Sequence, residues 1–332
     1  MVPELFQNIL SGLLPLNVLV TGASGFVGQH LCHTLAQQGC TVRGLVRDPS
    51  RLSSALRDSI QPVKITGLDD TATIAAALVG IDVVIHLAAR VHAMDDTQAQ
   101  DAEYERVNHQ GSMQLVRMAA AAGVRRLLFL SSIKVNGEER AAPYSLTDIP
   151  NPQDSYSRSK YAAESGLLAF AENSQLEVVV VRPPLVYGKG VKANFAQLIH
   201  WVVQGVPLPL ASVKNQRSLV SVVNLVDLLQ VCMTHPKACG QVFLVADDEV
   251  VSTTRLIQNI AQAYSVNARL FYCPQWLLRV IAKLLGRASS ADRLLGSLSV
   301  DISATKQCLD WHPPVTMMQT LVEMANAEGR NK

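Results

Sequence analysis

A short apolar strand that runs directly into a glycine-rich turn is the feature that most constrains the fold of this chain. Residues 17–20 read Asn-Val-Leu-Val, and residues 21–28 follow as Thr-Gly-Ala-Ser-Gly-Phe-Val-Gly. Val27, Leu31 and Leu35 then lie four residues apart, which is one face of a helix. A strand, a glycine turn and a helix N-terminus form an anion site, because small residues admit a pyrophosphate to the backbone and the helix dipole favours its charge. The expected ligand is a dinucleotide, and its predicted contacts here are Gly22, Ser24, Gly25, Phe26, Val27 and Gly28.

Strands and helices alternate along most of the chain beyond this turn. Short apolar runs predict strands at 41–46, 63–66, 83–87, 127–131 and 178–182, and longer amphipathic stretches predict helices at 70–79, 101–122 and 155–171. Apolar strands that alternate with helices are typical of a parallel sheet covered on both faces. We therefore predict an α/β fold with a doubly wound (Rossmann) parallel sheet and a smaller, mostly helical C-terminal region. Two later strand-like pieces, 218–223 and 241–245, are candidates for the edge of this sheet.

Composition excludes several classes of function. The 332 residues carry a net charge of +2 and no basic cluster, so we expect no nucleic-acid partner. No apolar run reaches the roughly 18 residues that a membrane span needs, and the leader 1–16 lacks the basic start of a signal peptide. The cysteines lack the Cys-x-x-Cys spacing of metal sites, and the histidines of the first helix lack carboxylate partners. We expect a cytoplasmic protein without a metal site, in which residues 1–16 are an N-terminal extension.

Tyr156 and Lys160 are the clearest candidates for catalysis, because four residues is the spacing that places two side chains on one helix face. A nearby ammonium favours the phenolate and pulls the tyrosine pKa, normally about 10, toward neutrality. A tyrosine tuned in this way can exchange a proton with a substrate hydroxyl. The same spacing is more often found on a solvated helix face, so the assignment depends on the motifs around it.

Taken together, these motifs resemble the extended short-chain dehydrogenase/reductases of the NAD-dependent epimerase/dehydratase family. Within that family they look most like the branch of UDP-hexose 4-epimerases and nucleotide-sugar 4-ketoreductases. The matching residues are the glycine turn, Tyr156 and Lys160, the runs 86–89 (His-Leu-Ala-Ala), 130–132 (Leu-Ser-Ser) and 182–188 (Arg-Pro-Pro-Leu-Val-Tyr-Gly), and Asn108 with Gly111 and Ser112. The resemblance extends over nearly the whole chain from Asn17, and it implies a homodimer.

The resemblance implies a Ser/Tyr/Lys catalytic set. Ser132, which precedes the family-like loop 133–137, would hydrogen-bond the reacting oxygen; the alternative is a serine that caps a turn at the strand end. Tyr156 would pass the proton, while Lys160 would hold the nicotinamide ribose and lower the tyrosine pKa. The family places a tyrosine where this chain has Asn136, so the sugar pocket is expected to differ in shape. The other implied cofactor contacts are Leu87, Ala88, Ala89, Pro183 and Asn108, the last of these with a structural role near Lys160.

The end of the second strand bears on the choice between NAD and NADP. NAD-selective relatives carry an acidic residue there, whereas this chain has Val46 followed by Arg47. A guanidinium suits the 2′-phosphate of NADP, and the run 42–49 resembles NADP-dependent dihydroflavonol-type reductases. We therefore favour NADP(H); NAD(H) is the alternative, in which Asp48 binds the ribose. Asp69 is expected to stand in for the aspartate that relatives place at the adenine.

Later residues are expected to hold a UDP-sugar. Arg217 matches the arginine that relatives place on the UDP diphosphate, and Arg293 is a second candidate. Two guanidinium groups suit the charge of a diphosphate. The other predicted substrate contacts are Ser132, Lys134 and Asn194. The predicted domains are 17–182 for NAD(P), with returning segments at about 218–246, and 183–217 with 247–332 for a nucleotide-sugar-binding cap.

The predicted cofactor favours net reduction over epimerisation. An epimerase returns the hydride to C4 of its substrate and retains its NAD, whereas a reductase consumes NADPH. We expect reduction of the C4 keto group of a UDP-4-keto-6-deoxy-N-acetylhexosamine, giving UDP-QuiNAc or UDP-FucNAc, because the runs 131–137 and 182–195 resemble enzymes of bacterial surface polysaccharide and O-antigen synthesis. The alternatives are a UDP-hexose (UDP-Glc or UDP-GlcNAc) 4-epimerase with bound NAD, and a non-catalytic NADP-sensing regulator. Such regulators usually lack the tyrosine and lysine pair.

Overall fold

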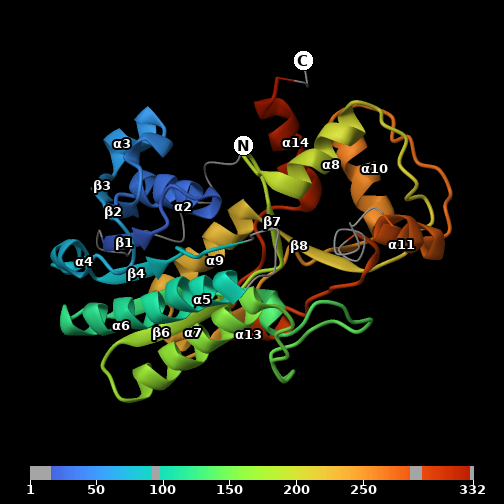
Figure 1. Cartoon of the computed structure of the whole chain (residues 1–332). Helices are drawn as coiled ribbons and strands as arrows, with labels where there is room; N and C mark the ends of the chain where they lie inside the picture. Colours follow the sequence, from blue (N-terminus) through green and yellow to red (C-terminus); the bar gives the residue numbers. More distant parts are fainter. Residues whose placement is uncertain (1–15, 92–97, 285–293, 330–332) are drawn as a thin grey trace. The chain divides into compact units, whose positions relative to one another are not determined.

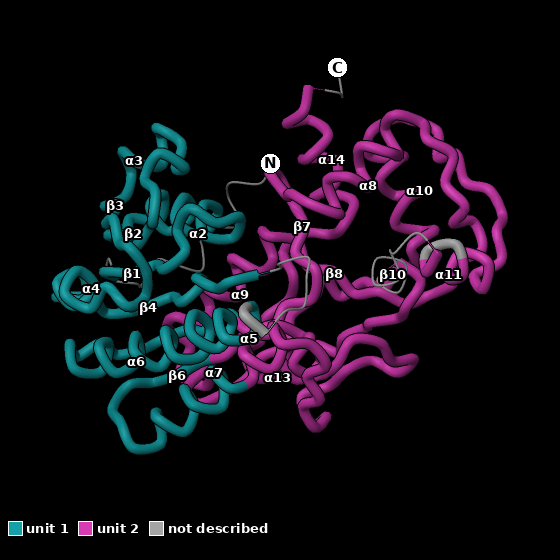
Figure 2. The backbone as a smooth tube through the Cα atoms, viewed as in Figure 1, with its two compact units in different colours: residues 1–130, 162–179 teal, residues 131–161, 180–332 magenta. Residues whose placement is uncertain are grey.

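The computed structural model describes residues 16–91, 98–284 and 294–329 (Figure 1). These residues form two compact units (Figure 2). Unit 1 contains the described residues up to Leu130 together with residues 162–179, and unit 2 contains residues 131–161 and the described residues from Val180 onward. The units therefore divide the chain inside α7 (Ser155–Glu172) and β6 (Glu177–Arg182). The division into a cofactor domain and a cap at residue 182 stays a prediction.

Alternating strands and helices make up unit 1. The strands are β1 (Asn17–Thr21), β2 (Thr41–Val46), β3 (Gln61–Lys64), β4 (Val83–His86) and β5 (Arg126–Leu130). The helical segments are α2 (Phe26–Gln37), η1 (Pro49–Arg51), α3 (Ser54–Ser59), α4 (Thr71–Leu78), α5 (Gln98–Tyr104), the π-helical turn η2 (Glu105–Gln110) and α6 (Gly111–Ala121). The helix predicted at 101–122 thus begins earlier and contains a π-helical turn, which the apolar periodicity does not indicate.

A seven-stranded sheet has the order β3-β2-β1-β4-β5-β6-β9, where β9 is Val242–Leu244. β1 pairs in parallel with β2 and with β4, so that Val20 lies opposite Gly44 on one side and Ile85 on the other. Val18, Leu19 and Val20 are fully buried, as expected for a central strand with both faces covered. The predicted doubly wound parallel sheet and the helical C-terminal region are confirmed.

One of the two candidates for the sheet edge was placed wrongly. The piece predicted at 241–245 joins the large sheet as β9, next to β6. The piece predicted at 218–223 is β8 (Arg217–Ser221), and it lies in a separate three-stranded sheet between β7 (Leu185–Tyr187) and β10 (Val250–Val251). β7 has only three residues and β10 only two, so neither carries enough alternation to be read from the sequence.

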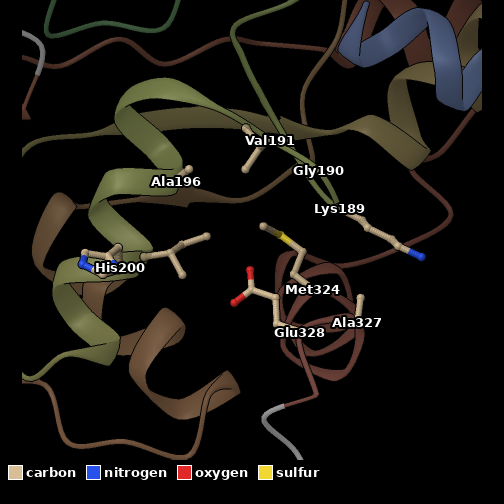
Figure 3. Close-up of a pocket in the computed structure, with 9 residues that line it drawn as sticks. Lys189, Gly190, Val191, Ala196, His200, Met324, Ala327 and Glu328 are labelled. Carbon is tan, nitrogen blue, oxygen red and sulfur yellow. The ribbon is translucent and has the colours of Figure 1, made fainter. Parts of the chain in front are cut away.

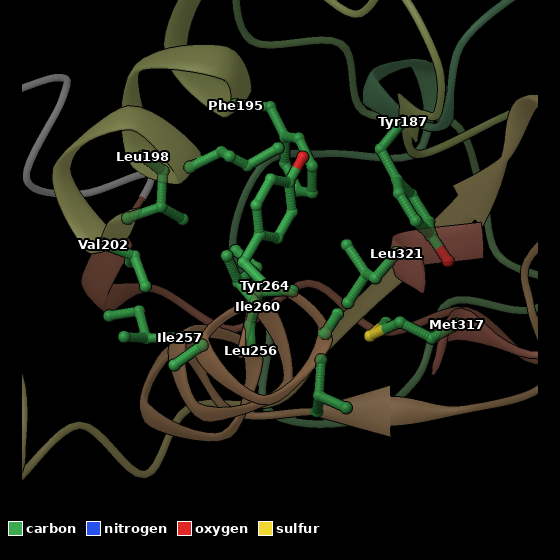
Figure 4. Packing of buried hydrophobic residues seen from close by; sticks show 14 of the residues in the cluster. Tyr187, Phe195, Leu198, Val202, Leu256, Ile257, Ile260, Tyr264, Met317 and Leu321 are labelled. Carbon is green, nitrogen blue, oxygen red and sulfur yellow. The ribbon is translucent and has the colours of Figure 1, made fainter. Parts of the chain in front are cut away.

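Helices dominate the rest of unit 2. They are η3 (Ile133–Val135), α8 (Ala193–Val203), α9 (Val222–Thr234), η4 (Pro236–Ala238), α10 (Thr253–Ala263), α11 (Gln275–Leu284), α13 (Ser303–Leu309) and α14 (Met317–Ala327). Phe195 of α8, Ile257 and Ile260 of α10, and Leu321 of α14 belong to one buried apolar cluster (Figure 4). No helix within the described ranges is both long enough and apolar enough to cross a membrane.

A buried polar network ties the small sheet of unit 2 to the chain that leaves β9. Asp247 accepts hydrogen bonds from the Tyr187 hydroxyl at 2.6 Å, from the Ser221 backbone N–H at 2.7 Å and from the Asn224 side-chain amide at 2.7 Å. Burial raises the pKa of the Asp247 carboxyl to about 6, although these three donors act in the opposite direction. The carboxylate is therefore held at a free-energy penalty that the donors offset only in part.

Replacing Asp247 with Asn should remove a specific pH dependence of stability. Because the pKa is raised from 3.8 to about 6 in the folded state, the native protein binds this proton more tightly than the unfolded chain does. The resulting stabilisation is complete below about pH 4 and is lost as the pH rises through about 6. The free energy of unfolding of the wild type relative to Asp247→Asn, from urea titrations, should fall across this window by about 2–3 kcal/mol. Asp248→Asn, at the exposed neighbour, should retain the wild-type slope; an unchanged slope in Asp247→Asn would contradict the assignment.

Candidate functional site

The glycine turn of unit 1 leaves no room for side chains at two of its positions. Gly22 has φ +69°, which L residues with a Cβ rarely adopt, and a Cβ there would lie 2.9 Å from the Ala88 backbone nitrogen. A Cβ on Gly28 would collide with the carbonyl oxygen of Gly22. The Gly25 N–H donates to that same carbonyl at 2.9 Å and closes the turn. The turn is therefore a bare backbone surface at the carboxyl end of β1.

Helix α2 begins at Phe26 directly after this turn, with Gly25 as its N-cap. No side chain caps the helix, and its first turn contains no acidic residue. Uncapped N–H groups and the positive end of the helix dipole favour an anion at this position. Ser24, Phe26 and Val27 are partly accessible beside the glycines. The residues present therefore fit the pyrophosphate of a dinucleotide.

A chain of buried hydrogen bonds joins the segments that follow β1 and β4. The Thr21 hydroxyl meets His86 Nδ1 at 2.7 Å, and His86 Nε2 meets the Ser112 hydroxyl at 2.8 Å. Ser112 donates to the Asn108 carbonyl at 2.5 Å, so His86 Nε2 is the donor to the Ser112 hydroxyl. The Ala88 N–H completes the chain by donating to Thr21 Oγ1 at 3.0 Å. The predicted contacts Leu87, Ala88 and Ala89 thus follow a strand end that is fixed to the glycine-turn strand.

Asn108 fixes the next part of the same segment. Its Oδ1 accepts from the Arg90 N–H at 2.8 Å, and its Nδ2 donates to the Arg90 carbonyl at 3.1 Å. The side chain is 1% exposed and lies in the π-helical turn η2. Asn108 therefore holds the backbone after β4, while its predicted relation to Lys160 stays a prediction.

The charged side chains at the end of β2 differ in whether they already have partners within the protein. Asp48 Oδ1 accepts from the Ser50 hydroxyl at 2.7 Å and from the Ser50 N–H at 3.0 Å, which lowers the carboxyl pKa. Arg47 is exposed and forms no ion pair with any described residue. Asp69, the predicted adenine contact, is exposed and 3.4 Å from the guanidinium of Arg106. The acidic side chain near this strand end is thus engaged in capping a turn, and the basic one remains available.

The candidate catalytic groups lie in unit 2, at the beginning of α7 and in the segment after β5. Tyr156 and Lys160 are both in the first turns of α7; Tyr156 is partly exposed and Lys160 is 2% exposed. Ser132 is partly exposed, and its Oγ accepts from the Lys134 N–H at 3.3 Å, so it caps η3. The cap was the alternative reading of Ser132, and it leaves the hydroxyl hydrogen available for a substrate oxygen.

Asp154 connects these two segments, and the sequence analysis did not single it out. Its Oδ1 accepts from the Ser157 N–H at 2.7 Å, and Ser157 Oγ accepts from the Asp154 N–H at 3.1 Å, which is a reciprocal helix cap. Its Oδ2 accepts from Lys134 Nζ at 2.6 Å. Burial alone would raise the pKa of this carboxyl, but the hydrogen bonds from Lys134 and Ser157 outweigh it and hold the pKa at about 2. An aspartate just before a serine-rich helix start is the sequence signal that could have identified it.

Two further residues, Asn136 and Pro183, lie at or contact loop 133–137, the loop in which this chain differs from the expected family pattern. Asn136 is 2% exposed, and its Oδ1 accepts from the Arg182 guanidinium at 2.9 Å. Pro183 follows Arg182, and its carbonyl accepts from the Ile133 N–H at 2.9 Å. Asn136 therefore serves to fasten loop 133–137 to the end of β6.

The predicted substrate contacts are scattered within unit 2. The ammonium of Lys134 lies 2.7 Å from Glu138 in addition to its contact with Asp154, so its charge is neutralised within the protein. Arg217 begins β8 and donates to the Gly296 carbonyl at 3.0 Å, and burial lowers its pKa. Asn194 is exposed in the first turn of α8. Arg293 lies outside the described residues.

A cavity of about 460 Å³ lies in unit 2 among the turn after β7, α8 and α14 (Figure 3). Its lining residues are Lys189, Gly190, Val191, Ala196, Ile199, His200, Met324, Ala327 and Glu328. None of the predicted site residues is among them. We therefore do not assign the substrate to this cavity.

Comparison with known proteins agrees with the fold and the motifs. The chain matches the NAD dependent epimerase/dehydratase family over residues 18–246, and it belongs to that family. The UDP-glucose 4-epimerase of Vibrio cholerae is 40% identical over 319 residues, covering 95% of this chain and 96% of the relative. The dihydroflavonol 4-reductase of Hordeum vulgare is 29% identical over 273 residues, covering 75% of this chain and 76% of the relative. The structure of MoeE5 in complex with UDP-glucuronic acid and NAD is similar in fold, with a TM-score of 0.76 at 24% identity, and covers 94% of this chain and 99% of MoeE5. The protein is thus an enzyme of the epimerase and reductase type, as the resemblance predicted.

Replacing Asp154 with Ala should weaken both the fold and the candidate catalytic set. Loss of the cap and of the Lys134 partner should lower the free energy of unfolding by about 1–3 kcal/mol in urea titrations. Because the pKa is held at about 2, this loss should be constant above about pH 4 and should shrink only as the pH falls toward 2. Asp70→Ala is the matched control, since Asp70 caps α4 in unit 1 and pairs with no lysine in the described part of the chain. Asp154→Ala should also lower turnover by about 10-fold or more, whereas Asp70→Ala should not; equal turnover in both variants would refute the positioning role.

Proposed function

We propose that the protein is an NADPH-dependent sugar-nucleotide reductase that acts on the C4 keto group of a UDP-4-keto-6-deoxy-N-acetylhexosamine. The product would be UDP-QuiNAc or UDP-FucNAc, for the synthesis of a surface polysaccharide such as O-antigen. The observation that carries the proposal is the end of β2, where Arg47 is exposed and unpaired among the described residues while Asp48 is bound to Ser50. An available guanidinium beside an engaged carboxylate favours a 2′-phosphate over a 2′-hydroxyl.

The side chains of unit 2 have separate roles in this reaction. Tyr156 donates its phenolic proton to the sugar O4, so that the carbonyl becomes a hydroxyl. Lys160 stabilises the resulting phenolate, and the Ser132 hydroxyl donates a hydrogen bond to O4 as negative charge develops there. The nicotinamide, when bound, supplies the hydride that C4 receives. Solvent then returns a proton to Tyr156 and completes the cycle.

The cofactor and the UDP moiety have candidate contacts in the described residues. Gly22, Gly25 and Gly28 offer the bare backbone for the pyrophosphate, with Ser24, Phe26 and Val27 beside them. The segment 87–89, Asn108, Asp69 and Pro183 are proposed to complete the cofactor site. Asn194 and Arg217 are proposed for the UDP diphosphate, within a cap formed by 183–217 and 247–332. We also propose a cytoplasmic homodimer, by analogy with the family.

A UDP-hexose 4-epimerase is the second candidate, and a specific observation favours it. The UDP-glucose 4-epimerase of Vibrio cholerae matches this chain over nearly the full length of both proteins at 40% identity. The same tyrosine, lysine and serine would serve that reaction, since it also moves a proton at O4. The difference is that an epimerase retains its cofactor and produces no net oxidation or reduction.

Incubation with NADPH or NADH and a panel of UDP-hexoses and UDP-4-keto sugars tests the proposal. A reductase should consume NADPH in proportion to the reduced sugar formed, as followed by absorbance and by product analysis. Conversion of a UDP-hexose to its C4 epimer without net cofactor consumption would establish the second candidate instead. Tyr156→Phe should lower turnover by about 100-fold or more while leaving cofactor affinity nearly unchanged. Full activity in that variant would refute the assigned proton donor.

Arg47→Ala tests the cofactor preference separately. Loss of a charge-assisted contact to a phosphate should weaken NADPH binding by about 10- to 100-fold, measured by calorimetry. NADH affinity should change by less than about 3-fold, because NADH has no 2′-phosphate for the guanidinium to bind. Arg51→Ala is a suitable control, as Arg51 is exposed four residues further along the chain. Equal losses for both cofactors would overturn the preference for NADPH.

A further inference from the structure

The outer face of α11 and the residues just before it expose large apolar side chains. Tyr272 is 73% exposed, Trp276 67%, Val280 48% and Leu284 82%, and Phe271 is 50% exposed. Tyr272, Trp276, Val280 and Leu284 recur every four residues, so those within α11 form one stripe along the helix. Grouped exposed aromatic and aliphatic side chains of this size mark an interaction surface rather than ordinary surface composition.

α11 is held to unit 2 by the opposite side of the helix. Leu278, two residues after Trp276, packs against the buried apolar cluster of α8, α10 and α14. Two residues correspond to about 200° around a helix, so the exposed stripe points away from that cluster. The helix is thus anchored by one face and presents a second apolar face to solvent.

The charged residues on and near this stripe in the sequence are all basic. Residues 250–284 contain Arg255, Arg269, Arg279 and Lys283 and no aspartate or glutamate. Lys283 is exposed and forms no ion pair with any described residue. Arg279 is 3.6 Å from Glu139, but both side chains are about half exposed, so this pair contributes little. Arg279 and Lys283 precede Val280 and Leu284 by one residue each, and they therefore form a basic edge along the apolar stripe.

We propose that α11 docks on the surface of a lipid bilayer that contains anionic lipids. A helix of ten residues is too short to span a bilayer, whereas an amphipathic helix with a basic edge lies flat at the interface. Trp276 and Tyr272 suit the headgroup level, Val280 and Leu284 reach the acyl boundary, and the exposed Lys283 meets the lipid phosphates. This surface is independent of the proposed reaction, because none of these residues belongs to the candidate catalytic or cofactor sites.

A second copy of the chain is a poorer occupant of this surface. In a symmetric pair, the same patch meets itself, so the basic edge of one helix would approach that of the other. Segment 250–284 contains no carboxylate, and Glu139 is already paired with Arg279 of its own chain, so neither provides a partner for Lys283 of the second copy. Like charges brought together at an interface are unfavourable, whereas anionic lipid headgroups complement them.

Vesicle flotation of the full-length protein tests the proposal. The protein should float with phosphatidylcholine vesicles that contain phosphatidylglycerol, and it should float less with phosphatidylcholine alone or at high salt. The double variant Trp276→Ser, Leu284→Ser should bind at least about 10-fold more weakly, and Lys283→Glu should lose the preference for the anionic lipid. Ile149→Ser is the matched control, because Ile149 is 87% exposed in unit 2 but lies outside the acid-free segment.

The variants also separate lipid binding from loss of the fold or from protein contacts. All of them should keep the wild-type melting temperature within a few degrees and the wild-type turnover in solution, since the altered side chains are exposed. Failure of the wild type to float with anionic vesicles would overturn the proposal, as would unchanged flotation of the double variant. If the double variant converts a dimer into monomers while the wild type does not bind vesicles, the stripe is a protein interface and the lipid assignment is wrong.

Discussion

The arrangement of the candidate catalytic set depends on the hydrogen bonds that the Asp154 carboxylate accepts. One oxygen accepts the Ser157 N–H at the start of α7, and the other accepts the Lys134 ammonium from the segment that follows Ser132. A partly buried carboxylate is stable only with such donors, so the helix start and the Ser132 segment must keep their mutual arrangement for the charge to remain satisfied. The segments that carry Tyr156 and Ser132 are in this way connected by a third residue that need not touch the substrate.

In unit 1, hydrogen bonds between buried polar groups connect the segments that follow β1 and β4. The hydrogen bonds lead from Thr21 through His86 and Ser112 to the Asn108 carbonyl, with His86 Nε2 donating to Ser112 and Ser112 donating to the carbonyl. The uncapped N-terminus of α2 follows directly after the glycine turn, where its dipole favours an anion.

The parts of this fold that could be predicted from the sequence are those with a regular local spacing of residues. The apolar run 17–20, the glycine turn and the pairing of Tyr156 with Lys160 on one helix all follow from local spacing, and the structure has β1, α2 and α7 at those places. The position of β8 and the role of Asp154 depend on partners distant in the sequence, β7 and β10 in one case and Lys134 in the other. Neither partner leaves a periodic signal, because strands of two or three residues are too short and a lysine on a turn has no preferred spacing to its carboxylate. Polar contacts between residues that are distant in the sequence therefore cannot be predicted from such patterns.

The distinction between reduction and epimerisation does not lie in the catalytic set. Proton transfer at O4 by a tyrosine beside a lysine is common to both reactions, and by microscopic reversibility it operates in either direction. What differs is whether the cofactor is exchanged at each turnover and whether the keto sugar can present both faces of C4. For the first, our proposal rests on the charge at the end of β2, where Asp48 is engaged by Ser50 and Arg47 is exposed. The second depends on the walls of the sugar site, and the sequence resemblance predicts that Asn136, which is fixed to Arg182, lies where the family places a tyrosine. Both differences lie outside the Ser132, Tyr156 and Lys160 set, so one arrangement of catalytic groups can serve either outcome while the surrounding residues decide which occurs.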